Sequence, residues 1–126
     1  MGYHPEGTSV KDAWYFTAGD EVHCIHMQRH DPGVEDDARE FCSLGHAVSS
    51  DLITWRTLPT ALRGGEEGGY DDARLHTGSV IEVDGTYYLY HTATSTAQKG
   101  VNRIALATST DTITWEKHPE NPIIVP

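Results

Sequence analysis

A seven-residue motif occurs twice in the chain and constrains the fold more than any other feature. Residues 49–55 read SSDLITW and residues 109–115 read STDTITW, so five of the seven positions are identical and the two tryptophans lie 60 residues apart. Each copy follows apolar and small residues and precedes a segment that contains proline. Self-similarity at a fixed spacing is typical of repeat architectures. The sequence therefore predicts two copies of one structural unit.

The segments upstream of the motif also resemble each other. Residues 14–28 read WYFTAGDEVHCIHMQ and residues 79–93 read SVIEVDGTYYLYHTA. Each contains two strand-like runs separated by a turn with Gly and Asp, which is a strong hairpin signal. A third strand before the Ser-Asp turn and a fourth around the tryptophan complete each unit. We predict an all-β chain of two four-stranded antiparallel β-propeller blades, residues 12–62 and 76–126, joined by a loop at 63–75.

Two other segments are predicted to be loops. Residues 34–41, VEDDAREF, are charged and only about two helical turns long, which suits a loop insertion better than a core helix. Residues 62–73, LRGGEEGGYDDA, are rich in glycine and acidic residues. We expect this second loop to be exposed, mobile or shaped around a ligand.

The aromatic residues are first assigned to the core. Trp55 and Trp115 occupy equivalent repeat positions, which favours packing between blades over a role as a sugar platform. Tyr87, Tyr88 and Tyr90 lie on one predicted strand and alternate between its faces, so at least one of them belongs to sheet packing.

Composition excludes several classes of protein. The chain has 126 residues and a formal net charge of −10, which disfavours binding to nucleic acid or anionic lipid and favours a neutral or cationic partner. No apolar run approaches the roughly 18 residues of a membrane span. The N-terminus lacks a secretory signal, so the expected location is cytoplasmic. Cys24 and Cys42 are expected to be buried free thiols, with a disulfide as the less common alternative.

The order of segments resembles the first two blades of the five-bladed propeller glycoside hydrolases, families 32 and 43. The residues that carry the resemblance are KDAWYF, EVHCIHMQ, GHAVSSDLITW, LHTGSVIEVDGTYYLYHTA and IALATSTDTITWEKHPENPII. It covers the chain from about Asp12 to the C-terminus. The resemblance implies an active site at the mouth of the central channel, reached by the innermost strand of each blade.

The resemblance assigns roles to a small set of residues. It implies that Asp12 is the catalytic nucleophile of a retaining enzyme or the general base of an inverting one. The family 32 signature has Asn before this Asp and Pro-Asn-Gly after it, whereas this chain has Lys11 and Ala-Trp-Tyr. Substrate contacts are expected from Asp71, Asp72, His76, Thr77 and Ser79. For the Asp71-Asp72 pair, a solvated turn is the alternative to a sugar contact.

The resemblance also implies an Asp on a third blade and a general-acid Glu beyond it, and neither has a counterpart here. Glycoside hydrolysis normally needs two carboxyl groups, about 5 to 5.5 Å apart in retaining enzymes and about 6.5 to 9.5 Å apart in inverting ones. Two blades also cannot close a ring, because propellers typically have four to eight. The sequence is expected to end where a third blade would begin.

Three interpretations follow: a piece of a larger enzyme, an assembly of chains, or a degenerate relative kept for binding. We favour a homo-oligomer, or a partner chain that supplies the remaining blades. In a homo-oligomeric ring, facing Asp12 carboxylates would raise one another's pKa, so that one could act as acid and another as base.

Other chemistries are less well supported. His23, His26 and His30 have a metal-like spacing, but residues three apart on a strand point to opposite faces, which argues against zinc. No cofactor is expected, although a structural calcium ion at Asp36, Asp37 or the Asp71-Asp72 loop stays open. The chain has neither a nucleophilic-serine motif nor a phosphate-binding loop. Two functions remain: hydrolysis of furanosides or related neutral glycans, or a non-catalytic carbohydrate-binding or structural propeller fragment.

Overall fold

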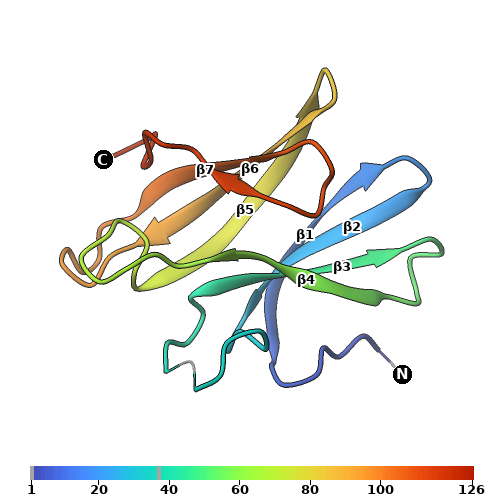
Figure 1. Cartoon of the computed structure of the whole chain (residues 1–126), viewed down its shortest axis with the longest axis horizontal. Coiled ribbons are helices and arrows are strands. Elements are labelled where there is room, and N and C mark those ends of the chain that lie inside the picture. The colour runs from blue at the N-terminus through green and yellow to red at the C-terminus, as the bar shows by residue number, and fades with distance from the viewer. Residues whose placement is uncertain (1, 37) are drawn as a thin grey trace.

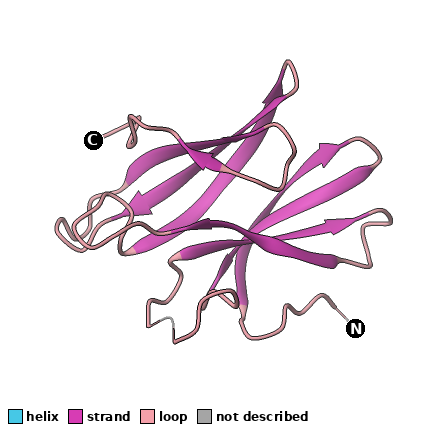
Figure 2. Ribbon diagram, viewed as in Figure 1, coloured by secondary structure: helices cyan, strands magenta, loops and turns pink. Residues whose placement is uncertain are grey.

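The computed structural model describes residues 2–36 and 38–126, and these residues form eight strands (Figure 1). The strands are β1 (Val10–Ala18), β2 (Glu21–Gln28), β3 (Ser43–Ser49), β4 (Arg56–Arg63), β5 (Arg74–Val83), β6 (Thr86–Thr94), β7 (Arg103–Ser109) and β8 (Glu116–Lys117). They make two four-stranded antiparallel sheets with the orders β1-β2-β3-β4 and β5-β6-β7-β8. Figure 2 shows strands and loops only in the part of the chain that is described. The all-β prediction with two four-stranded blades is confirmed.

Residues alternate in burial along each innermost strand, so each sheet has two distinct faces. Trp14 and Phe16 on β1 are buried, whereas Tyr15 between them is exposed. On β5, Val80 packs against the common core and Ile81 is exposed. Successive side chains of a strand point to opposite faces. One face of the first blade therefore packs against one face of the second, and the other two faces carry exposed apolar side chains.

The core lies between the two sheets. Its fully buried members include Ile25 and Leu44 from the first blade and Leu75 and Leu89 from the second.

Trp115 closes the contact between the blades. Its ring meets the ring of Phe16 edge-on, with centroids 6.1 Å apart and an interplanar angle of 86°. Tyr87 also meets Phe16, at 5.6 Å. Trp55, the repeat partner of Trp115, is half-buried against Tyr15 on the opposite face of the first blade, with centroids 5.8 Å apart. The prediction of packing between blades is confirmed for Trp115, whereas Trp55 contacts Tyr15 of its own blade.

The repeated SxDxITW motif forms the turn before each outermost strand. The Asp51 carboxylate accepts hydrogen bonds from the backbone N–H groups of Ile53 and Thr54, at 2.9 and 2.7 Å. Asp111 accepts the equivalent bonds at the same two distances. These bonds lower the pKa of both carboxyl groups to about 2. An Asp side chain that bonds backbone groups two and three residues onward stabilises a tight turn, which explains why the motif repeats.

The 34–41 segment has neither helix nor strand at its described positions, as predicted for a loop insertion. Cys24 and Cys42 are buried free thiols, which confirms the expectation. Burial raises the pKa of Cys24 to about 11. Among the described residues, no helix is long and apolar enough to cross a membrane.

Candidate functional site

Asp12 and Thr77 meet where the innermost strands of the two blades begin. The Thr77 hydroxyl donates a hydrogen bond to Oδ2 of Asp12 at 2.9 Å. Each residue lies six positions before the last residue of its strand, so the two positions are equivalent in the repeat. Each also lies at an irregularity in the pairing of its strand, between Lys11 and Ala13 in β1 and between Leu75 and Gly78 in β5. The same β-bulge therefore aims one side chain from each blade at a shared point.

The backbone conformation of Asp12 explains why the pairing of β1 with β2 is interrupted at this residue. Asp12 has a φ of +43°, in the left-handed region that L-residues rarely adopt. In β5, a side chain at Gly78 would collide with the backbone carbonyl of Tyr90, so this position of the bulge requires glycine. Asp12 and Thr77 are both exposed to solvent.

His76 adjoins this pair, whereas Ser79 does not. The Nε2 of His76 lies 3.4 Å from the Thr94 hydroxyl. Burial lowers the pKa of His76, and the nearby charges of Arg74 and Lys11 lower it further against the opposite effect of Asp12. Together these effects favour the neutral form of the His76 imidazole. Ser79 pairs with Tyr90 and lies two residues before Ile81, so it is placed on the outer face of the second blade.

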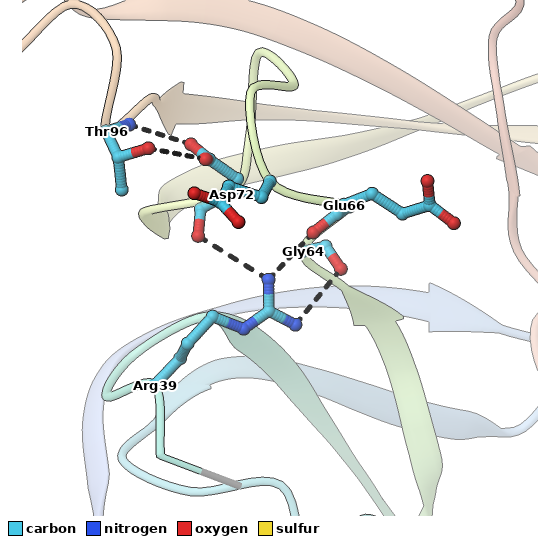
Figure 3. Close-up of a pocket in the computed structure, with 7 residues that line it drawn as sticks. Arg39, Gly64, Glu66, Asp72 and Thr96 are labelled. Carbon is cyan, nitrogen blue, oxygen red and sulfur yellow. Dashed lines mark hydrogen bonds between the residues drawn. The ribbon is translucent and has the colours of Figure 1, made fainter.

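Asp71 and Asp72 are buried, so the alternative that they form a solvated turn is wrong. Lys117 donates to Oδ2 of Asp71 at 2.6 Å, and the N–H of Gly65 donates to Oδ1 at 3.0 Å. The Asp72 carboxylate accepts bonds from the Thr96 hydroxyl at 2.5 Å, the Thr96 N–H at 2.7 Å and the Gly68 N–H at 2.9 Å (Figure 3). These bonds lower the pKa of Asp72 to about 2. Both carboxylates hold loops together and neither joins the Asp12–Thr77 contact.

Arg39 connects the loops around this end of the blades. Its guanidinium donates to the carbonyls of Gly65 at 2.8 Å, Gly64 at 3.4 Å and Asp72 at 3.5 Å (Figure 3). Beside it lies an open cavity of about 740 Å³. The cavity is lined by residues from three loops: Arg39, Gly64, Gly65, Glu66, Glu67, Asp72 and Thr96. The pairing registers place these loops at the end of the sheets where β1 and β5 begin. Sequence reasoning missed Arg39 because its partners are backbone carbonyls 25 to 33 residues away.

Two buried histidines contact each other and an aromatic ring of the core. The Nδ1 of His23 and the Nε2 of His46 share a hydrogen bond of 2.8 Å, and His23 stacks on Phe16. Burial lowers the pKa of His46 to about 3. Across residues 2–36 and 38–126, no group of three or more His, Cys, Asp or Glu side chains could hold a metal ion. Asp37, one of the positions open to calcium, lies outside the described residues.

The sequence matches a known family over most of its length. Residues 15–126 match the family described as glycosyl hydrolases family 32 N-terminal domain, a region that begins three residues after Asp12. An onion (Allium cepa) bifunctional 6(G)-fructosyltransferase/2,1-fructan:2,1-fructan 1-fructosyltransferase is 37% identical over 86 residues, covering 65% of this chain and 14% of that protein. An acid beta-fructofuranosidase of Vicia faba is 35% identical over 86 residues, covering 65% and 13%.

Solved structures share the fold. Fructan 1-exohydrolase IIa from Cichorium intybus superposes with a TM-score of 0.76 at 24% identity, covering 99% of this chain and 23% of that one. A family 43 beta-xylosidase/alpha-arabinofuranosidase from a compost microbial metagenome, in complex with xylotriose, gives 0.71 at 18% identity, covering 95% and 38%. The chain spans 13 to 14% of the length of the curated relatives described above. With two propeller-type blades and a family match over most of its residues, the chain belongs to the family 32 glycosyl hydrolases, within their N-terminal domain.

Proposed function

We propose that this chain provides the first two blades of a propeller that hydrolyses or transfers fructosyl groups of neutral glycans, with the remaining blades supplied by further chains or further sequence. The hydrogen bond between Asp12 and Thr77 is the observation that carries the proposal. It brings an exposed carboxylate and a hydroxyl group from two blades into contact. The proposed substrates are fructosides because the relatives are named as a fructosyltransferase and a beta-fructofuranosidase.

The proposed chemistry divides between this chain and the rest of the ring. An Asp12 oxygen either attacks the anomeric carbon, forming a glycosyl ester while the leaving oxygen takes a proton, or removes a proton from the attacking water. Thr77 donates to the same carboxylate and so holds it in one orientation. The two acidic residues that precede Thr77 in the loop before β5 are engaged elsewhere, Asp71 by Lys117 and Asp72 by Thr96. The proton donor is therefore supplied from outside these two blades.

Sugar release by the assembled ring tests the proposal. The substrates are sucrose, a fructan, an aryl α-L-arabinofuranoside and an aryl β-xyloside. We expect turnover of the fructosides, its loss in Asp12→Asn, and a loss on the order of 10-fold in Thr77→Val, which removes a hydrogen bond to a charged group. Asp20→Asn, an exposed carboxylate in the first hairpin turn, is the matched control and should retain full activity.

The second candidate function is a carbohydrate-binding propeller unit without turnover, and the engagement of the Asp71 and Asp72 carboxylates by Lys117 and Thr96 favours it. Thermal stabilisation by fructan without any sugar release would support it and overturn the catalytic proposal. Asp12→Asn would then leave the stabilisation within a few-fold of the wild type, since a neutral amide still forms hydrogen bonds with hydroxyl groups.

A further inference from the structure

Two buried histidines occupy equivalent positions in the two blades, beside the bulges that carry Asp12 and Thr77. His91 follows His26 by the same number of residues as Thr77 follows Asp12. His26 on β2 is paired with the residue that follows Asp12, and His91 on β6 with the residue that follows Thr77. Each histidine is only 1% exposed. The repeat therefore places the same side chain behind each bulge.

The two histidines make the same hydrogen bond. Nδ1 of His26 lies 3.2 Å from the carbonyl oxygen of Met27, and Nδ1 of His91 lies 3.2 Å from that of Thr92. A carbonyl oxygen only accepts hydrogen bonds, so Nδ1 carries a proton in both rings and is the donor. Burial lowers the pKa of both imidazoles, that of His91 to about 4, and so favours their neutral form. The neutral ring then has a lone pair on Nε2.

This second ring nitrogen gains nothing from its position. In the part of the chain that the structure describes, Nε2 of both His26 and His91 is buried without a hydrogen-bond partner. A buried acceptor without a partner destabilises a folded chain, and an apolar side chain of similar size would avoid that cost. The hydrogen bond from Nδ1, rather than packing, therefore accounts for a histidine at each position.

The carbonyls that accept these bonds belong to the backbone that faces the bulges. Met27 is paired with the residue before Asp12, and Thr92 lies opposite the bulge that contains Thr77. The side chain of Met27 also adjoins the site, because the Thr77 hydroxyl lies 4.0 Å from its sulfur. The histidine bond in the first blade thus fixes a residue that adjoins both members of the Asp12–Thr77 contact.

We propose that His26 and His91 are positioning residues, which fix the backbone opposite the two bulges and so hold the Asp12 carboxylate against the Thr77 hydroxyl. A bulge interrupts the ladder of its strand, so its geometry depends on how firmly the facing strand is held. Both histidines are buried, and they act through the exposed Asp12 and Thr77 rather than on the sugar. The inference rests on the proposed function where it links the orientation of Asp12 to turnover.

Sugar release by His26 variants of the assembled ring tests the proposal. His26→Leu removes the donor, and should lower kcat on the order of 10- to 100-fold with KM within about twofold, because a misplaced reacting group affects the chemical step. His26→Asn keeps an N–H donor attached to Cγ, as Nδ1 is, and should restore kcat to within about threefold of the wild type.

His4→Leu is the matched control for these variants. Nδ1 of the exposed His4 makes the same kind of bond, at 3.0 Å to the carbonyl of Pro5, but His4 lies outside the strands. Its loss should leave kcat and KM unchanged. Urea unfolding of each variant checks that it is folded.

His91 should act through Thr77, which gives a second test. His91→Leu is expected to lower kcat by no more than Thr77→Val does, on the order of 10-fold. Combined with Thr77→Val it should cause no further loss, because the hydroxyl that it positions is already absent. Losses that multiply in the double variant would contradict this role of His91.

A spectroscopic signal separates the positioning from turnover. The carbon-13 resonance of the Asp12 carboxyl group reports the contact, and Thr77→Val gives its position when the contact is broken. We expect His26→Leu to move the resonance toward that position, His26→Asn to return it, and His4→Leu to leave it at the wild-type value. An unmoved resonance in His26→Leu, or a loss of kcat that His26→Asn does not restore, would overturn the proposal. A wild type without sugar release would refute the proposed function, and the resonance would still decide whether the histidine holds the contact.

Discussion

Replacing Trp115 with alanine removes the largest side chain at the contact between the blades. Trp115 is 8% exposed, its Nε1 donates to the carbonyl of Thr112 at 3.0 Å, and its ring meets Phe16 edge-on. Burying about 200 Å² of such a side chain at about 25 cal/mol per Å² contributes roughly 5 kcal/mol as an upper bound. Buried Trp-to-Ala substitutions cost about 3 to 5 kcal/mol. We expect Trp115→Ala to lower the free energy of unfolding by about 4 kcal/mol.

Trp55→Ala is the matched control, since it changes the same position of the repeated motif. Trp55 is half-buried against Tyr15, a residue of its own blade. Its loss should cost about 1 to 2 kcal/mol, because the transfer term is partial and no enclosed cavity remains. Urea unfolding followed by circular dichroism measures both variants and the wild type.

Equal losses in the two variants would refute the reasoning. They would mean that the tryptophan stabilises its own blade, through the turn and the outermost strand, and that packing between the blades adds nothing. A loss from Trp115→Ala alone would instead assign the stabilisation to the inter-blade contact. A cost of 4 kcal/mol is a large fraction of the roughly 5 to 15 kcal/mol that stabilises most domains.

Three further substitutions probe the surroundings of buried polar side chains, namely His26, His46 and Asp71. Gly45→Ala should cost about 1 to 3 kcal/mol in urea unfolding, because the imidazole of His26 occupies the space of the added methyl group. Burial lowers the pKa of His46 to about 3, so on acidification the unfolded chain is protonated at this residue before the folded chain is. The free energy of unfolding should therefore fall as the pH is lowered from about 6.5 to about 3, by up to about 1.4 kcal/mol per pH unit. His46→Gln should reduce this dependence on pH. Lys117→Met leaves the buried Asp71 carboxylate without its cation. It should lower the free energy of unfolding by about 2 kcal/mol, which thermal unfolding measures.

The fold could be predicted from sequence because its signals are local and occur twice. The Asp51 and Asp111 turns, and the Asp-Gly hairpin at Asp84, depend on residues within a few positions of each other. Because the same turn occurs twice, with its tryptophans 60 residues apart, the sequence between the copies must contain one full repeat of the strands. The role of Trp115 followed from the same repetition, since a side chain at a repeated position serves a repeated contact.

The arrangement of the site was less accessible. Strand alternation predicts which face a residue occupies, but a bulge inserts one residue and changes that count, so the meeting of Asp12 and Thr77 has no signature in periodicity. Gly78 was the available signal, because a glycine within a strand often marks a bulge. The loop acids were misjudged because acidic and glycine-rich composition suggests solvent. Asp72 is instead buried, and its carboxylate is hydrogen-bonded to Thr96, 24 residues away.

The repeat separates the two tasks of the chain. In each blade, the bulged position near the start of the innermost strand belongs to the Asp12–Thr77 contact, and later positions of that strand pack in the core between the blades. Asp12 and Thr77 show that the bulge keeps its geometry while its side chain changes from a carboxylate to a hydroxyl. A blade can therefore vary the side chain at its bulge without disturbing the contact between the blades. On this reasoning, Asp12→Asn should leave the free energy of unfolding within about 0.5 kcal/mol of the wild type, because Asp12 is exposed and takes no part in the packing between the blades.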